Sequence, residues 1–426
     1  MLSLQFIRDN PDAVRKALRD RRSEEAGLDE ILRLDRERRD LLTQTEALRA
    51  ERNAIGKRVG SAGDAAERQH LIDETRHLSD GLDTLEPRGK EIDERLNGLL
   101  LDLPSIPDAD TPIGAGEDDN VIVRTEGTPP QFDFEPRPHW EIGERLGIID
   151  FERGVKLSGS RFYVLKGAGA RLERALIAWM LDLHTEKQGY TEVYPPSVVK
   201  EECLLGAGQL PKFRDNLYHD VEDDLWLIPT AEVPLTNLHR DEILEPDALP
   251  LRYVAYTPCF RREKMSAGRD VRGIKRGHQF DKVEMYKLCR PEDSDAELEA
   301  LVGDAEDVCR GLNLPYRVKQ LCTGDLGFSA VMAYDIDVWA PGCGEWLEVS
   351  TCSNCGDFQG RRAGIRFRRE KGAKVEFVHT LNGSGLGLPR TLATVIESYQ
   401  QRNGSIVVPD VLRPYMGGLG LIARES

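Results

Sequence analysis

Leucine and isoleucine recur every seven residues over most of the first hundred positions, in two successive runs. The repeat falls at Leu34, Leu41, Leu48 and Ile55, flanked by Ile31 and Val59, and then at Leu71, Leu78, Leu85, Ile92 and Leu99, accompanied by Leu82 and Leu96. Such a repeat is typical of helices that pack along one narrow apolar stripe. Between the runs lies GSAGDAA, residues 60–66, which has the composition of a turn. The pattern therefore predicts an antiparallel coiled-coil hairpin.

The predicted hairpin has one weak point. Each helix of ~35 residues spans roughly 50 Å at a rise of 1.5 Å per residue. Pro87 falls inside the second helix, where the missing N–H and the bulk of the ring predict a kink or a break. Gly89 weakens the same turn of helix.

The two helices carry different charge. Residues 28–60 contain eight Lys and Arg against seven acidic residues, whereas residues 64–101 contain five against ten. Two interpretations fit this difference: a solvated coiled coil with ordinary surface ion pairs, or an arm whose first helix binds a polyanion. Charge alone does not separate them.

Composition excludes several classes of protein. The formal net charge of −16 argues against general binding of nucleic acid, so any phosphate-binding surface must be a local patch. The start of the chain has no signal-peptide pattern, and no run of 18 uncharged apolar residues occurs, so we expect no membrane or secretory role. Eight scattered cysteines indicate reduced thiols and a cytoplasmic location.

The rest of the chain has a mixed pattern. Residues 103–120, LPSIPDADTPIGAGEDDN, read as a linker. Beyond it, the chain mixes helical windows at 168–187 and 293–313 with β-rich runs at 225–228, 334–339 and 346–349, which predicts a mixed α/β or α+β domain. We expect an N-terminal domain over 1–104 with its coiled-coil arm at about 27–101, a linker over 105–125, and a second domain over 126–426.

The most unusual stretch is FRREKMSAGRDVRGIKRGHQF, residues 260–280, a basic segment in an acidic chain. Two β-like runs, 253–260 and 279–288, flank it, so the sequence predicts a hairpin. Its loop would present Arg269, Arg272, Lys275 and Arg276, while Arg261 projects from the strand. Each guanidinium group can bind two phosphate oxygens at once, so the loop can bind a nucleoside triphosphate. An ordinary basic surface hairpin is an equally good interpretation of the loop alone. Glu263 and Glu284, beside these arginines, favour the nucleotide site.

These residues are recognisable as a family pattern. FRRE together with HQFDKVE, residues 260–263 and 278–284, resembles motif 2 of class II aminoacyl-tRNA synthetases, in the form found in seryl-tRNA synthetases. GYTEVYPPSVV, residues 189–199, resembles motif 1, and LNGSGLGLPRTL, residues 381–392, resembles motif 3. IPTAEVPLTN, residues 228–237, is similar to the loop that folds over the amino acid, and GDLGFSA, residues 324–330, also matches that family. The resemblance covers residues 1 to about 419.

The resemblance implies a fold and an activity. The fold would be α+β, with an N-terminal antiparallel coiled-coil arm and a catalytic domain built on an antiparallel sheet flanked by helices. The enzyme would activate L-serine with ATP and Mg²⁺ to seryl-adenylate and pyrophosphate. It would then transfer serine to tRNA(Ser), and also to tRNA(Sec). It would be a cytoplasmic homodimer in which the arm of one subunit serves the active site of the other by recognising the long variable arm of the tRNA.

The resemblance also assigns site residues. The catalytic residues would be Arg261, Arg390 and Glu348. ATP would contact Arg261, Arg262, Glu263, Arg276, Phe280, Glu348, Val349, Ser350, Thr351 and Arg390, with Glu348 and Thr351 holding Mg²⁺. Serine would contact Thr230, Ala231, Glu232, Arg261, Glu284, Asn382 and Ser384. The arm would bind tRNA through Arg36, Arg39, Arg49, Arg52 and Arg58.

The sequence also offers one candidate zinc site and two alternative functions. Cys352 and Cys355 form a CxxC pair, but a single pair is a weak zinc signal, so we expect no structural zinc. A related ligase that loads an amino acid onto a carrier protein would lack the long arm. A non-enzymatic RNA-binding paralogue would have lost Arg261, Glu284 or Arg390, all of which are present. The residues at Lys264–Met265 and Met332–Ala333 differ from those common at these positions in the family.

Overall fold

The computed structural model describes residues 1–264 and 272–424. Arg269 and Met265, which the sequence places in the basic loop, lie outside the described residues. The chain divides into two compact units, one of residues Leu2–Pro104 and the other of Ser105–Ser426 together with Met1. Each unit is described by itself below.

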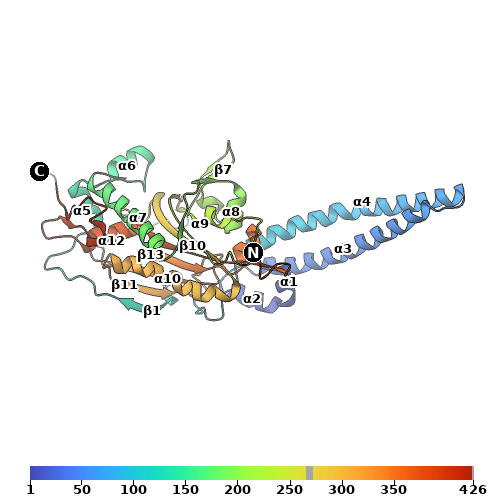
Figure 1. Cartoon of the computed structure of the whole chain (residues 1–426), viewed down its shortest axis with the longest axis horizontal. Coiled ribbons are helices and arrows are strands. Elements are labelled where there is room, and N and C mark those ends of the chain that lie inside the picture. Colours follow the sequence, from blue (N-terminus) through green and yellow to red (C-terminus); the bar gives the residue numbers. More distant parts are fainter. Residues whose placement is uncertain (265–271, 425–426) are drawn as a thin grey trace. The chain divides into compact units, whose positions relative to one another are not determined.

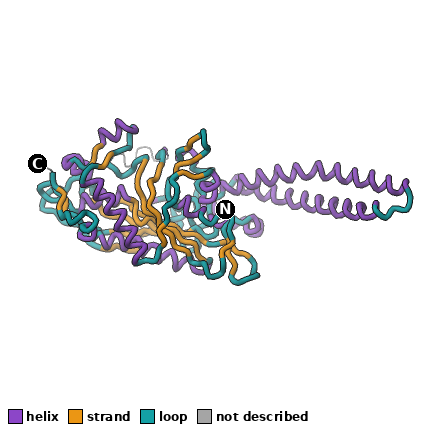
Figure 2. The backbone as a smooth tube through the Cα atoms, turned by 45° about the horizontal axis from the view of Figure 1, so that its top comes forward, coloured by secondary structure: helices purple, strands orange, loops and turns teal. Residues whose placement is uncertain are grey.

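The first unit is entirely helical. Two short helices, α1 (Leu4–Asp9) and α2 (Pro11–Asp20), precede the long helices α3 (Ala26–Val59) and α4 (Ala65–Asp102). Figures 1 and 2 show α3 and α4 lying side by side in opposite directions, which is the predicted hairpin. The Asp64 carboxylate begins α4 by accepting N–H groups from Ala66 and Glu67 at 2.9 and 2.8 Å.

The apolar repeat forms the seam between α3 and α4. Most of the predicted positions are buried, but Leu48, Leu85 and Leu99 are only partly covered. Near the end of α4 the buried position shifts from Leu99 to Leu100, because a straight helix of 3.6 residues per turn drifts away from a strict seven-residue repeat. Thr45 is also buried in the seam, which the apolar pattern did not predict.

Pro87 does not break the second helix. The α4 helix continues through it without interruption, so the predicted break is wrong. Pro87 and Asp83, whose carbonyl loses its usual donor, are both exposed, so water can satisfy that carbonyl. Ion pairs to α3 lie on both sides of the proline, from Glu86 to Arg49 and from Arg88 to Glu37.

The second unit is built on an eight-stranded sheet with the order β1-β11-β12-β13-β16-β10-β9-β4. All neighbouring strands are antiparallel except β4 and β9. The strands are β1 (Val121–Glu126), β4 (Thr191–Glu192), β9 (Leu251–Phe260), β10 (Gln279–Cys289), β11 (Tyr316–Gln320), β12 (Met332–Ala340), β13 (Glu345–Asn354) and β16 (His379–Gly387). The hairpin predicted around the basic loop is β9 and β10, in which Phe260 is opposite Gln279.

Helices α7 (Ala168–Glu186), α10 (Ser294–Gly311) and α12 (Leu388–Ser398) pack on the sheet. Their apolar side chains join Val283 and Met285 of β10 in the main hydrophobic core. Because side chains alternate along a strand, Lys282 and Glu284 lie on the opposite face of β10. That face is left for polar chemistry.

Smaller elements surround this framework. The helices are α5 (His139–Leu146), α6 (Phe151–Ser158), α8 (Glu201–Ala207), α9 (Glu232–Asn237) and α11 (Phe358–Ala363), and the 3₁₀ turns are Glu117–Asp119, Arg214–Asn216, Pro291–Asp293 and Asp410–Leu412. The short strands are β2 (Ile149–Asp150), β3 (Val164–Leu165), β5 (Val198–Val199), β6 (His219–Asp220), β7 (Leu225–Leu227), β8 (Ile243–Leu244), β14 (Arg366–Arg368), β15 (Val375–Phe377), β17 (Ile406–Val407) and β18 (Leu421–Ile422). Over the described part of the chain, no helix combines the length and the apolar character that crossing a bilayer requires.

The seam predicts where the arm is vulnerable. Leu82 is 2% exposed, so Leu82→Ala should lower the free energy of unfolding of the arm by about 2–5 kcal/mol through the cavity it leaves. Leu42 on α3 is 48% exposed, and Leu42→Ala is the matched control, with an expected change of no more than about 0.5 kcal/mol. Urea unfolding followed by helical circular dichroism measures both. Equal midpoints for the two variants would contradict the seam.

Candidate active site

A cavity of about 410 Å³ opens on the polar face of the sheet. Most of the site residues predicted from the sequence line it. They are Thr230, Glu232, Arg261, Glu263, Arg276, Phe280, Glu284, Glu348, Val349, Ser350, Thr351, Asn382, Ser384 and Arg390. Segments separated by more than a hundred residues therefore meet at one site.

Strand register explains this convergence. On β10, Phe280, Lys282 and Glu284 occur at every second position and so share one face. On the neighbouring β16, Ser384 is directly opposite Glu284, and Asn382 lies two residues away on the same face. The central strands of the sheet thus form the floor of the cavity.

One end of the cavity is basic. Arg261 is held by its Nε, which donates to the carbonyl of Pro229 at 3.2 Å, and its guanidinium lies 5.1 Å from the centre of the Phe280 ring. Arg390, at the start of α12, donates from Nη1 to the carbonyl of Glu348 at 2.6 Å and from Nε to the carbonyl of Lys275 at 3.4 Å. Backbone carbonyls thus fix the orientation of both guanidinium groups.

Glu263 and Arg276 lie on the two sides of the basic loop and form an ion pair. Arg276 Nη1 is 3.0 Å from Glu263 Oε2. Glu263 is buried and has a φ of +50°, a left-handed conformation that is uncommon for a residue with a side chain. The resemblance implied an adenine contact for Glu263 and a phosphate contact for Arg276. In this structure the two side chains also bind each other.

The other end of the cavity is acidic. Glu284 is buried, and its Oε2 lies 2.6 Å from Lys282 Nζ and accepts a hydrogen bond from Ser384 Oγ at 3.4 Å. Glu232 Oε1 accepts the side-chain amide groups of Gln359 at 2.6 Å and Asn382 at 3.2 Å. Burial, together with the nearby charge of Glu284, raises the pKa of Glu232 to about 7. Two acidic groups at this end suit a ligand with an ammonium group.

Gln359 sets the orientation of Glu232. Its Oε1 accepts hydrogen bonds from Tyr286 OH at 3.1 Å and Thr380 Oγ1 at 2.6 Å, and its Nε2 also donates to the carbonyl of Ala207 at 3.0 Å. With the carbonyl oxygen fixed by two hydroxyl donors, the amide group must face Glu232.

Glu348 and Thr351 form the wall on β13. Glu348 is half exposed, with its Oε1 3.3 Å from Arg390 Nη1, and Thr351 Oγ1 donates to Asp335 at 2.6 Å. Burial and the charge of Glu348 raise the pKa of Asp335. Because the Thr351 proton is committed to Asp335, its oxygen keeps lone pairs that can accept. A carboxylate and a hydroxyl oxygen are ligand types that fit Mg²⁺.

Some predicted residues are not at the cavity. Arg262 turns away, with Nε donating to the carbonyl of Leu217 at 2.8 Å and its guanidinium over Tyr218. Ala231 is buried in a hydrophobic cluster behind the wall. The arm arginines belong to the other unit: Arg39 pairs with Asp35 and Arg49 with Glu86, whereas Arg36, Arg52 and Arg58 form no ion pair among the residues that the structure describes. Lys264 is exposed, and Met332 begins β12.

Other lining residues were not among the predicted site residues. They are Gln209, Lys275, Gly277, Lys282, Gly387 and Pro389. Lys282 could have been predicted from the sequence, since it precedes Glu284 by two positions on the same strand and therefore shares its face. Gln209 follows α8, and no pattern in the sequence connects it to this site.

A second cavity of about 570 Å³ adjoins the first and shares Glu232, Arg261 and Asn382 with it. Its outer wall contains Phe328 and Ser329, from the GDLGFSA stretch. Gln209, Glu263 and Arg276 also line both cavities, so this motif lies next to the site.

The group of potential metal ligands in the structure is not at the CxxC pair. Within the described ranges, the three potential ligand groups that lie close together are His139, Cys343 and Glu397, and neither Cys352 nor Cys355 is among them.

Comparison with known proteins places this geometry in a family. A model of the seryl-tRNA synthetase N-terminal domain matches residues 1–107, and a model of the class II tRNA synthetase core domain (G, H, P, S and T) matches residues 213–399. A serine–tRNA ligase from Roseiflexus sp. (strain RS-1) is 62% identical over 424 residues and covers 100% of both chains. The chain belongs to the seryl-tRNA synthetase family.

Solved structures agree with this assignment. The seryl-tRNA synthetase from Pyrococcus horikoshii, complexed with ATP, superposes with a TM-score of 0.95 at 37% identity and covers 100% of both chains. The cytoplasmic serine–tRNA ligase from Naegleria fowleri, in complex with AMP, gives 0.88 at 30% identity over 100% of this chain and 99% of the other. The M. kandleri synthetase, solved in complex with A. aeolicus tRNASec, shares the fold alone, with a TM-score of 0.58 at 16% identity over 82% of this chain and 69% of the other.

Family membership confirms several predictions. The resemblance to seryl-tRNA synthetases, the α+β fold class with a helical arm, and the enzyme class are all confirmed. The activity of this chain is the aminoacylation of tRNA(Ser), as the resemblance implied.

The raised pKa of Glu232 predicts a pH effect on stability. In the unfolded chain Glu232 ionises near its ordinary pKa of 4.5, whereas in the folded protein it keeps its proton up to about pH 7. The folded state binds more protons in this window, so its free energy of unfolding falls as pH rises from about 4.5 to about 7. Glu232→Gln should remove this part of the slope.

Melting temperatures between pH 4.5 and 8, without serine, measure the effect. Glu173, whose burial raises its pKa to about 8, is unchanged in both proteins and contributes equally to both curves. Parallel curves for the two proteins would show that Glu232 is ionised in the folded state.

Proposed function

We propose that the cavity carries out both steps of serine activation and transfer, with ATP at its basic end and serine at its acidic end. The single observation that carries this proposal is the separation of charge. Arg261 directly follows Phe260, which is opposite Gln279 at the start of β10, and Arg390 donates to the carbonyl of Lys275. Glu284 lies further along β10, opposite Ser384, and Glu232 accepts a hydrogen bond from Asn382. All four charged residues line one cavity of about 410 Å³. A triphosphate and an amino-acid ammonium have this same separation of charge, and electrostatic complementarity orients them for reaction.

Arg261 is the residue of the basic end that we place at the α-phosphate, which the serine carboxylate attacks. Held by the Pro229 carbonyl, its guanidinium can neutralise charge that develops as the serine carboxylate displaces pyrophosphate. Phe280, under Arg261, supplies an aromatic face for adenine, with Glu263 near the adenine edge. Arg276 and Arg390 then hold the outer phosphates. Such a reaction depends on positioning and charge neutralisation, so a protein nucleophile is unnecessary.

Magnesium fits the oxygen donors on β13. Glu348 and Thr351 would hold it beside the phosphates, and when bound it neutralises phosphate charge. The residues of the chain bind and orient ATP around it.

Serine selectivity follows from the polar wall of the acidic end. Glu284, Asn382 and Ser384 can bond the serine hydroxyl and the α-ammonium, with Thr230 and Ala231 shaping the loop above. Alanine would leave these buried polar groups unpaired, and sites of this kind discriminate by about 10⁴ or more. The extra methyl of threonine must be excluded by bulk.

Transfer of serine requires a bound tRNA. We assign residues 1–104 to tRNA binding, residues 105–125 to a linker and residues 126–426 to catalysis, with the arm recognising the long variable arm of tRNA(Ser) by shape and backbone. The same arm would accept tRNA(Sec), and the complex of A. aeolicus tRNASec with the M. kandleri synthetase, which shares this fold, is compatible with that extension. The enzyme would act in the cytoplasm.

A homodimer is part of the proposal. The short edge strand β4 leads to Tyr194, which is 92% exposed, and Val198 is also exposed. Exposed apolar side chains beside a sheet edge are typical of protein interfaces. In the dimer, the arm of one subunit would serve the active site of its partner.

The role of Arg261 can be tested against its neighbour. Arg261→Ala should lower serine-dependent exchange of pyrophosphate into ATP by about 10²-fold or more, because the guanidinium acts on the transition state. Arg262→Ala, which removes an equal charge directed toward Leu217, should lower it by less than about tenfold. Equal losses in the two variants would refute the assigned role.

The arm can be tested by a matched pair of double variants. Arg52→Ala/Arg58→Ala on α3 should raise the KM for tRNA(Ser) about tenfold. It should also reduce the salt dependence of this KM, because a protein that makes fewer phosphate contacts displaces fewer counterions from the RNA on binding. Arg68→Ala/Arg76→Ala on α4 removes the same charge from the other helix and should change the KM by less than about threefold. Charging of tRNA transcripts measures both, and pyrophosphate exchange should stay unchanged in both.

A further inference from the structure

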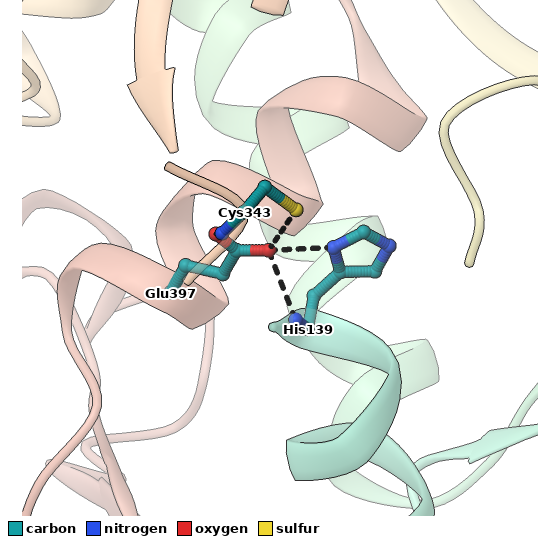
Figure 3. Close-up of side chains that lie close together, drawn as sticks. All are labelled: His139, Cys343 and Glu397. Atoms are coloured by element: carbon teal, nitrogen blue, oxygen red, sulfur yellow. Dashed lines mark hydrogen bonds and ion pairs between the residues drawn. The ribbon is translucent and has the colours of Figure 1, made fainter. Parts of the chain in front are cut away.

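A buried polar cluster lies behind the ATP end of the cavity and contributes no residue to its wall. It consists of His139 at the start of α5, Cys343 in the turn between β12 and β13, and Glu397 near the end of α12 (Figure 3). His139 and Glu397 are both fully buried. Three elements distant in sequence therefore meet at one carboxylate.

Glu397 accepts every donor that the cluster offers. Its Oε1 receives the backbone N–H of His139 at 2.9 Å, His139 Nδ1 at 2.7 Å and Cys343 Sγ at 3.1 Å. Its Oε2 receives the backbone N–H groups of Gly342 at 2.8 Å and Cys343 at 3.0 Å. Burial alone would raise the pKa of Glu397, but hydrogen bonds from His139 and Cys343 outweigh it, and the pKa lies below its ordinary value.

The imidazole of His139 is bonded at both nitrogens. Its Nε2 accepts the backbone N–H of Ile274 at 3.1 Å, so in this arrangement the ring proton is on Nδ1, facing Glu397. A metal ion at Nδ1 would have to displace that proton and compete with four other donors to the carboxylate. The pattern of donors and acceptors therefore favours a hydrogen-bonded link over a metal site.

The residue that His139 holds lies in the basic loop. Ile274 immediately precedes Lys275 and Arg276, both of which line the cavity. The neighbouring contacts reinforce this attachment: Gly273 has a φ of +76°, and a Cβ there would approach His139 Nε2 to 2.1 Å. Arg272 lies over the Trp140 ring at 5.0 Å. The end of the loop is thus fixed to the first turn of α5.

The other side of the cluster leads to the second phosphate-binding arginine. Glu397 and Arg390 lie on the same helix, α12, two turns apart. Arg390 itself donates to the carbonyl of Lys275. The loop that presents Arg276 and the helix that presents Arg390 are therefore joined twice, once through Arg390 and once through His139 and Glu397.

We propose that His139 is a positioning residue for ATP, which holds the end of the basic loop against α12 so that Arg276 and Arg390 converge on the triphosphate. The inference rests on the proposed binding of ATP at the basic end. A small displacement of a group that orients substrate weakens binding and catalysis, although His139 itself touches no ligand.

Two substitutions test the two hydrogen bonds of the His139 imidazole one at a time. Asparagine places an amide near the position of Nδ1, and glutamine reaches the position of Nε2. His139→Asn keeps a donor for Glu397 but leaves the Ile274 N–H unpaired, so the KM for ATP in pyrophosphate exchange should rise about tenfold. The KM for serine should stay within about twofold. His139→Gln restores an acceptor for Ile274, and the KM for ATP should return to within about threefold of the unsubstituted enzyme.

Tyr399→Phe is the matched control. It removes one hydrogen bond made at the end of the same helix, from Tyr399 OH to the carbonyl of Leu312 at 2.8 Å, which involves no residue of the loop. It should lower the melting temperature while leaving the KM for ATP unchanged. If the KM values for ATP and serine rise together in His139→Asn, or if neither rises, the positioning role is refuted.

A third variant, Arg276→Ala, distinguishes failure of this inference from failure of the proposed function. If Arg276→Ala leaves the KM for ATP unchanged, the assignment of the basic end to the triphosphate is wrong. If Arg276→Ala raises that KM and His139→Asn does not, the ATP site stands and only the role of His139 fails.

Discussion

The alternation of side chains along β10 is the constraint on which the rest of the structure depends. Val283 and Met285 enter the core beneath α7, α10 and α12, while Lys282 and Glu284 face the cavity. A slip of one residue against β9 or β16 would exchange these two sets and bury charge in the apolar core. The apolar core and the polar site therefore fix each other's position.

Charges in the cavity are compensated within the protein. Glu284 has Lys282, Glu263 has Arg276, and Glu232 has two amide donors. Buried charge is tolerated in a folded protein when it is paired and hydrogen-bonded. Substrate binding must then exchange some of these internal partners for phosphate oxygens and an ammonium group.

Fully buried groups outside the cavity extend the same logic. Glu397 collects donors from His139 of α5 and from the turn after β12, and Gln359 does the equivalent behind Glu232. Each group makes several short hydrogen bonds that a small displacement would leave unsatisfied. Rigid supports of this kind place the groups that touch substrate.

The sequence by itself determined the long helical hairpin and the β9–β10 hairpin, because these depend on local periodicity and on short contiguous segments. It indicated most of the cavity wall only through its resemblance to the synthetase family. It did not determine that α4 would pass through Pro87, which depends on the exposure of the Asp83 carbonyl. It could not direct Arg262 away from Arg261, since backbone carbonyls distant in sequence hold them. Only the tertiary structure brought His139, Ile274 and Glu397 together, because hydrogen bonds between residues more than a hundred positions apart leave no local pattern.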